Sequence, residues 1–135
     1  MSKVLILIVM IFMHIVDDYY LQGWLASAKQ KSWWEENAPD ELYKNDYLMA
    51  LFMHGFSWTF MVMFVPSMYM MLNTPLDRIN LTPLFILVMF VINLIVHTTT
   101  DHSKANLKKI NLVQDQLIHL LQIVVTWLAM VIVNG

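Results

Sequence analysis

Four long apolar stretches constrain this chain more than any other feature of its sequence. A helix that crosses a lipid bilayer needs about 20 mostly apolar residues, and stretches near that length lie at about residues 3–28, 47–72, 83–102 and 111–133. Such segments cross as helices, because a bilayer offers no water to unpaired backbone groups. The pattern predicts an all-α fold, an integral membrane bundle of four transmembrane helices, up-and-down with short loops, in a single domain over residues 1–135.

The composition excludes the main alternatives. Hydrophobic residues make up 59% of the chain and charged residues only 13%, whereas soluble domains carry about a quarter charged residues. A net charge of −2 provides no basic surface for nucleic acid, and the absence of cysteine excludes disulfides and thiolate metal sites. The lipid bilayer is therefore the predicted partner, no nucleic acid is expected, and nothing in the sequence indicates an oligomeric state.

The first two stretches each contain an irregular feature. The purely apolar run 4–13 is short, and the small residues 26–28 resemble a signal-peptide cleavage site. Two aspartates and several aromatic residues separate the run from that site, which argues against cleavage. In the second stretch, Pro66 is expected either to kink the helix or to end its regular part near Val65.

The basic residues predict an orientation in the membrane. One side of a four-span bundle carries only Lys3 and Arg78. The first and third loops together carry six lysines: Lys29, Lys31, Lys44, Lys104, Lys108 and Lys109. Since cytoplasmic loops are enriched in Lys and Arg, these two loops are predicted to be cytoplasmic and both termini to lie outside.

Ionisable residues inside the predicted spans recur at one spacing. Each costs about 2.5 to 3.5 kcal/mol to insert, so such residues need partners and usually have a function. Residues four apart lie on one face of a helix, one turn from each other. Three His/Asp pairs on three helices have this spacing: His14 with Asp18, His97 with Asp101, and Asp115 with His119.

A fourth histidine, His54, lies near the start of the second stretch, so each predicted helix contributes one imidazole. Measured from the first and third loops, all seven side chains lie at one level of the bundle. Four imidazoles and three carboxylates at one level predict a site for one or two divalent metal ions per chain. Zinc is expected first, with manganese, iron and magnesium as alternatives, because sulfur ligands are absent.

Each of these residues also has a simpler interpretation. A lone buried histidine such as His54 often binds only a backbone carbonyl, and a single His/Asp pair can be an ion pair that helps two helices pack. Their common level favours the joint metal site. Further polar residues continue the same faces and are expected to hydrogen-bond the ligands: Asp17, Gln22, Asn93 and Gln116, with Asn111 and Gln122 on the same stripes.

Four motifs occur in an order that resembles a known family. They are His14-x3-Asp18-x2-Leu21-Gln22, then His54, then His97-x3-Asp101-x2-Lys104, then Asp115-Gln116-x2-His119. Over nearly its whole length the chain resembles the family of small prokaryotic and phage membrane proteins known as domain of unknown function 3307. More loosely, it is similar to the small membrane-bound metal-dependent hydrolases.

The resemblance implies a protein of the bacterial inner (cytoplasmic) membrane with a metal site at these positions, and it implies no substrate. The chain departs from the family at Asp17, where the family more often has a small residue. That departure leaves open whether Asp17 or Asp18 is the ligand.

The leading functional hypothesis is a membrane-embedded metal-dependent hydrolase. A bound metal would activate water and polarise a carbonyl or phosphoryl oxygen. Asp101 and Asp115 are the predicted catalytic carboxylates, and Lys104, on the face of His97, is predicted to stabilise an anion. The substrate would be a lipid, a lipid-linked phosphate or an amphiphile at the cytoplasmic headgroup level.

Two other functions fit the same residues. The first is a divalent-cation or proton transporter or channel, although the halves of the helices far from the histidines are almost entirely apolar. The second is a small phage or bacterial membrane effector that binds another membrane protein and uses the metal only to hold its helices together.

Overall fold

The structure, a computed structural model, describes residues 2–75 and 81–134, and that part of the chain is helical without any strand. This confirms the all-α prediction. Four segments are long and apolar enough to cross a membrane: Lys3–Leu21, Glu41–Asn73, Thr82–Ala105 and Leu112–Asn134. In chain order the elements are α1 (Lys3–Val16), the π-helix η1 (Asp17–Leu21), α2 (Leu25–Ala28), α3 (Lys31–Asn37), the 3-10 helix η2 (Glu41–Tyr43), α4 (Asp46–Asn73), α5 (Thr82–Ala105) and α6 (Leu112–Asn134).

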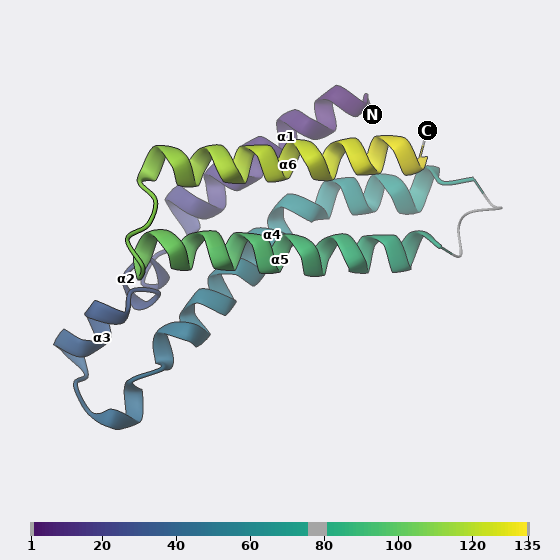
Figure 1. The fold of residues 1–135 in the computed structure, drawn as a ribbon. Helices are drawn as coiled ribbons and strands as arrows, with labels where there is room; N and C mark the ends of the chain where they lie inside the picture. The colour runs from purple at the N-terminus through teal and green to yellow at the C-terminus, as the bar shows by residue number, and fades with distance from the viewer. Residues whose placement is uncertain (1, 76–80, 135) are drawn as a thin grey trace.

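The four long helices run back and forth, so that both chain termini lie at one end of the molecule (Figure 1). We call this the terminal end. Residues 22–45, which include α2 and α3, and the connection 106–111 lie together at the opposite end, which we call the loop end. The six lysines of the orientation argument belong to the loop end or to the last turn of α5 beside it. Arg78 lies outside the described residues.

The first predicted helix is divided in the structure. Regular α-helix ends at Val16, a π-helical turn follows, and the chain bends at Gly23, where φ is +50°. Glycine adopts a positive φ without the steric cost that a Cβ would bring. The continuous helix expected to residue 28 therefore becomes α1, η1 and the short, separate α2.

The other long helices differ from expectation at single positions. Helix α4 continues past Pro66 to Asn73, so it does not end near Val65. Helix α5 carries Pro83 in its first turn, where the missing N–H has no intrahelical partner to lose. Helix α6 begins with a reciprocal cap, because Asn111 Oδ1 accepts from the Gln114 N–H and Gln114 Oε1 accepts from the Asn111 N–H. Asn111 is thus a helix cap and not part of the metal-facing stripe.

The apolar core lies on the side of the histidines that faces the terminal end. Its buried members come from α1, α4 and α6: Ile6, Met10, Trp58, Val62, Met70, Ile123 and Met130. Leu and Phe side chains on the outside of the same helices are largely exposed, as expected for helices surrounded by lipid.

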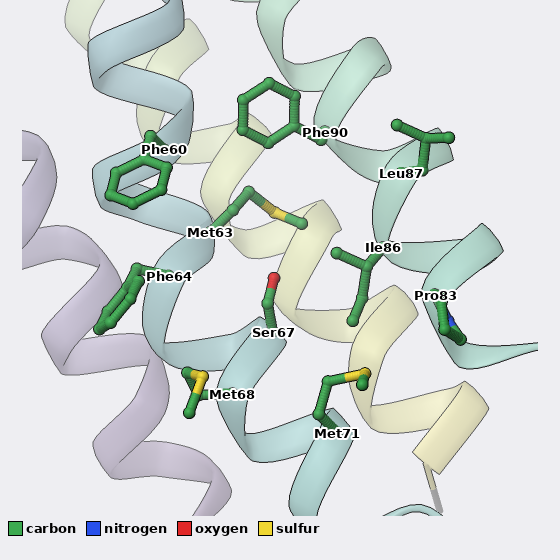
Figure 2. A pocket seen from close by; sticks show the side chains of 10 residues that line it. All are labelled: Phe60, Met63, Phe64, Ser67, Met68, Met71, Pro83, Ile86, Leu87 and Phe90. Atoms are coloured by element: carbon green, nitrogen blue, oxygen red, sulfur yellow. The ribbon is translucent and has the colours of Figure 1, made fainter. Parts of the chain in front are cut away.

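Helices α4 and α5 approach most tightly at Gly55. A Cβ at this position would collide with Thr98 Oγ1 and lie 3.3 Å from Leu94 Cδ1. Gly55 follows His54 directly, so its small size brings that histidine close to α5. Farther along the same two helices, mostly apolar side chains line a pocket of about 410 Å³, with Ser67 as its polar member (Figure 2).

Candidate metal centre

The site is centred on His54 Nε2. Three donor atoms from other elements lie 3.3 Å from it: Asp18 Oδ1, Asp101 Oδ2 and His97 Nε2. These four residues come from η1, α4 and α5, and their side chains are almost completely buried. Three segments that are distant in sequence therefore direct polar atoms at one small volume.

These spacings fit the geometry of a metal site. Zinc bonds to nitrogen and oxygen of about 2.0 to 2.1 Å place two ligands of a tetrahedron about 3.3 Å apart. Two of the atoms around His54, His97 Nε2 and Asp101 Oδ2, lie 4.0 Å from each other. Asp18, His54 and His97 form one group of donors that all lie within 4.8 Å of one another.

A second donor group shares His97 with the first and also contains Asp101, which lies beside His54. His97, Asp101 and His119 also place donor atoms within 4.8 Å of one another. His119 Nε2 lies 3.4 Å from Asp101 Oδ1 and 3.4 Å from Asp115 Oδ1. Asp101 thus faces His54 with one carboxylate oxygen and His119 with the other, the arrangement of a carboxylate that could bridge two metal positions.

The π-helical turn explains how Asp17 and Asp18 both reach the interior. Adjacent residues of an α-helix point about 100° apart, and π-turns inserted in α-helices are frequent at functional sites. Asp18 faces the cluster, whereas Asp17 Oδ1 accepts from Ser57 Oγ at 2.6 Å and Asp17 Oδ2 lies 3.6 Å from His54 Nδ1. Asp17 is therefore placed to orient the imidazole from behind, as carboxylates commonly do for metal-binding histidines.

The charges of the cluster do not balance with the groups of the chain alone. Among residues 2–75 and 81–134, Asp17, Asp18, Asp101 and Asp115 face only two ammonium groups, Lys29 and Lys104. With neutral imidazoles, the four carboxylates and two ammonium groups leave a formal charge of −2. One divalent cation would cancel that charge.

Two imidazolium groups would cancel the charge equally. Asp18 Oδ1 and Asp115 Oδ1 are buried and accept no hydrogen bond, although imidazole nitrogens lie 3.3 and 3.4 Å away. Imidazolium N–H donors aimed at these oxygens would satisfy them, since a buried acceptor without a donor costs about 1 to 3 kcal/mol. A cation near Asp18 Oδ1 or Asp115 Oδ1 would compensate these two oxygens as an imidazolium donor would.

Two lysines hold the carboxylates from the loop end. Lys29, at the end of α2, is buried and its Nζ lies 2.5 Å from Asp101 Oδ2. Lys104 Nζ lies 2.6 Å from Asp115 Oδ2. Asn106 attaches the Lys29 segment to α5, because its Nδ2 donates to the Lys29 carbonyl and its Oδ1 accepts from the Lys31 N–H.

His14 lies at the same level but belongs to neither donor group. Its Nδ1 accepts a 2.8 Å hydrogen bond from Trp58 Nε1. An indole nitrogen can only donate, so this bond occupies the lone pair of His14 Nδ1. Asp18 Oδ2 lies 3.3 Å from the same nitrogen. The structure places His14 beside the cluster with its Nδ1 bonded to Trp58, and the ligand role predicted for it, which would use Nε2, stays a prediction.

The polar residues predicted to support the ligands have different partners. Gln116 Nε2 approaches Asp115 Oδ2 at 3.1 Å and Asp18 Oδ2 at 3.4 Å, so it connects two carboxylates of the cluster. Gln22 donates to the backbone carbonyl of Asp18. Asn93 instead forms a buried network with Gln122 and Thr126, between the histidines and the apolar core.

Sequence reasoning missed two residues that shape this site. The Trp58 ring stacks on His97 with centroids 4.2 Å apart, and His97 stacks on His119 at 4.2 Å. A signal existed, because Trp58 is four residues after His54. Lys29 had no comparable signal, since its approach to Asp101 depends on the path of a loop.

Two pockets adjoin the cluster. One, of about 530 Å³, lies against α1 and α6 and has apolar walls with polar members: Ile11, His14, Ile15, Tyr19, Tyr20, Gln116 and Leu120. The other, of about 280 Å³, lies at the loop end and is lined by Gln22, Ala26, Lys29, Gln30, Lys104, Ala105 and Lys108. Residues that contact the carboxylates of the cluster, Gln116, Lys29 and Lys104, form part of these pocket walls.

No protein-family model, curated protein or solved structure matches the chain. The resemblance found in the motifs stays a prediction, and any function has to be argued from the cluster and its pockets.

Proposed function

We propose that the chain is a membrane-embedded, metal-dependent hydrolase. The observation that carries this proposal is the convergence of His54, His97, His119, Asp18 and Asp101 on one small buried volume, where Asp18 Oδ1 accepts no hydrogen bond. The residues suit a divalent metal, with zinc first because nitrogen and oxygen donors at these spacings match it. Such an ion supplies an activated water and polarises the bond to be hydrolysed.

The proposal places the four long helices across the bacterial inner membrane, with the loop end in the cytoplasm and both termini outside. Four segments of sufficient length and apolarity support the spans, and the lysines of the loop end support the orientation. The cluster would then lie near the cytoplasmic headgroups.

Three residues would have separate roles in the hydrolysis. Asp101, which faces both donor groups, would hold the metal and fix its position. Asp115 Oδ1, which is buried and accepts no hydrogen bond, would accept a proton from the attacking water. Lys104 would stabilise the anion that forms beside it.

The pocket against α1 and α6 supports an amphiphilic substrate. Its apolar walls, Ile11, Ile15 and Leu120, suit an acyl or prenyl chain, and Gln116 connects it with the cluster. A transporter would instead need a polar route to the terminal end. The buried polar network ends near Thr126, and the apolar core residues Ile6, Met70 and Met130 lie beyond it toward the terminal end, which favours hydrolysis over transport.

One observation favours a second function. The donor side chains are almost fully buried, and structural metal sites are closed whereas catalytic sites keep an open coordination position. A membrane effector that uses the metal to hold its helices together would have this burial. Turnover distinguishes the two functions, because only the hydrolase loses activity when a ligand changes and the fold is retained.

The experiment begins with elemental analysis of the detergent-purified protein. A stoichiometric divalent metal is expected in the wild type and a loss of at least tenfold in His97→Ala. Wild-type protein that binds no divalent metal would overturn the proposal.

The second step measures turnover of amphiphilic esters and phosphate esters in lipid nanodiscs. Asp101→Asn is expected to reduce kcat by at least a hundredfold while the protein still folds and inserts. Asp46→Asn, a change of the same type at an exposed residue that begins α4, is the matched control and should retain activity. Full turnover by metal-loaded Asp101→Asn would contradict the catalytic assignment.

A further inference from the structure

The pocket at the loop end has an unusual charge pattern for a protein with so few charges. Three lysines, Lys29, Lys104 and Lys108, line it together with two glutamines, and none of its lining residues is acidic. The whole chain has only eight basic residues. Ammonium groups that line one small concave volume can offer several N–H donors to an anion.

Two of these lysines connect the pocket with the metal-binding residues. The ammonium groups of Lys29 and Lys104 contact Asp101 and Asp115, at 2.5 and 2.6 Å. An ammonium group has three N–H donors, so each can bind its carboxylate and still donate to a ligand in the pocket. An anion held there would lie next to the metal-binding carboxylates.

The third lysine, Lys108, has a left-handed backbone conformation. Lys108 has φ +54° and is the only non-glycine with a positive φ among the described residues. After the end of a helix this conformation is usually taken by glycine, and side chains with a Cβ adopt it at a cost. Lys108 also has no carboxylate partner in the part of the chain that the structure describes. The turn that ends α5, closed by the hydrogen bond from the Lys109 N–H to the Ser103 carbonyl, holds this backbone and places the exposed Lys108 at the edge of the pocket.

We propose that this pocket binds a phosphate group, so that the substrate is the phosphate ester of an amphiphile. This inference rests on the proposed hydrolase function and names its substrate class. In the reaction, the oxygen of water bonds to phosphorus, the ester P–O bond breaks, and the leaving alkoxide receives a proton that derives from the water. The products are an alcohol and inorganic phosphate.

A pair of neighbouring lysines provides a matched test. Lys108→Gln removes a lysine that lines the pocket, and Lys109→Gln removes an exposed lysine next to it that does not. With zinc-loaded protein and phosphatidic acid in nanodiscs, Lys108→Gln should raise KM about tenfold and leave kcat within twofold of wild type. Lys109→Gln should leave both within twofold. Equal effects of the two changes would show general surface attraction and would overturn the proposal.

A binding measurement separates the pocket from catalysis. Calorimetric titration with inorganic phosphate at 150 mM NaCl should show binding to the wild type and to Lys109→Gln, and at least tenfold weaker binding to Lys108→Gln. Lys108→Gly should weaken phosphate binding equally but melt at the same temperature as wild type or higher, because glycine relieves the backbone strain. Unchanged phosphate binding in both Lys108 variants would exclude the pocket.

A comparison of two substrates shows whether the phosphate belongs to a lipid or to a soluble molecule. Hydrolysis of phosphatidic acid with little hydrolysis of glycerol 3-phosphate identifies a lipid phosphate, and equal rates identify a soluble one. If the protein binds zinc and hydrolyses a neutral monoacylglycerol but not these phosphates, the phosphate proposal fails and the hydrolase proposal stands. If the protein binds no divalent metal, the hydrolase proposal itself fails.

Discussion

The two ends of the helical bundle are held together by different physical interactions. Toward the loop end, histidines, aspartates and lysines form specific polar contacts between named atoms, such as Lys29 with Asp101 at 2.5 Å. Toward the terminal end, Ile6, Val62, Ile123 and Met130 pack without polar partners. On the proposed membrane placement, lipid tails are as apolar as these side chains, so packing and not burial from water would stabilise that end. The loop end therefore holds the residues of the candidate metal site, whereas the terminal end mainly packs the helices against one another.

Of the changes considered, removal of the metal should lower the free energy of unfolding most, because it acts on the loop end. In the wild type, a chelator should lower the free energy of unfolding by about 4 kcal/mol, the contribution of a ligand present at about a thousand times its Kd. Thermal unfolding in detergent, followed by circular dichroism, measures the change. The chelator should have no further effect on His97→Ala. Identical unfolding of the wild type with and without chelator would show that the loop end is stable without a cation.

Truncation in the apolar core should have the next largest effect. Ile123 is fully buried, and Ile123→Ala should lower the free energy of unfolding by about 2 kcal/mol, since in lipid the cavity remains as the main cost. The metal content should be unchanged. Leu121→Ala, at an exposed position of the same helix, is the control and should cost less than about 0.5 kcal/mol. Loss of the metal from Ile123→Ala would show that the two ends are coupled.

The smallest effect is expected at Trp58, which lies between the two regions. Trp58→Phe keeps an aromatic ring against His97 but removes the N–H that binds His14 Nδ1, at a cost of about 1 kcal/mol. The metal stoichiometry should be retained, and the nitrogen NMR signals of His14 should shift. Trp127→Phe, which loses a hydrogen bond to the Lys3 carbonyl near the terminal end, is the matched control and should leave those signals unchanged. Loss of metal in Trp58→Phe would assign His14 or Trp58 a larger part in the cluster.

The regular part of the molecule could be predicted from the sequence because it follows from periodicity. Four apolar stretches predict four long helices, and the four-residue spacing of His97 with Asp101 and of Asp115 with His119 places each pair on one face. His97, Asp101 and His119 join His54 and Asp18 in two adjoining donor groups, and Asp115 lies behind His119 at 3.4 Å.

The remaining parts of the site depend on irregular backbone and on competition between partners. The π-helical turn rotates Asp17 toward His54 and Ser57, and no periodic pattern marks such a turn. Lys29 reaches Asp101 through a loop, which hydropathy does not describe. His14 has the same spacing to Asp18 as the other pairs, but its Nδ1 accepts a hydrogen bond from the indole N–H of Trp58. Spacing predicts which side chains can meet, whereas the choice among several partners depends on the three-dimensional arrangement.

The two hydrogen bonds of Asn106 connect residues 75 and 77 positions apart, and this separation has a consequence for biogenesis. During synthesis, Asp17, Asp18 and Lys29 leave the ribosome long before Asp101 and Asn106 have been made. On the proposed membrane placement, the first two aspartates enter the translocation machinery without their eventual neighbours. The nascent chain must then keep these acidic side chains hydrated, at the bilayer surface or against the insertase, until the last helix hairpin arrives.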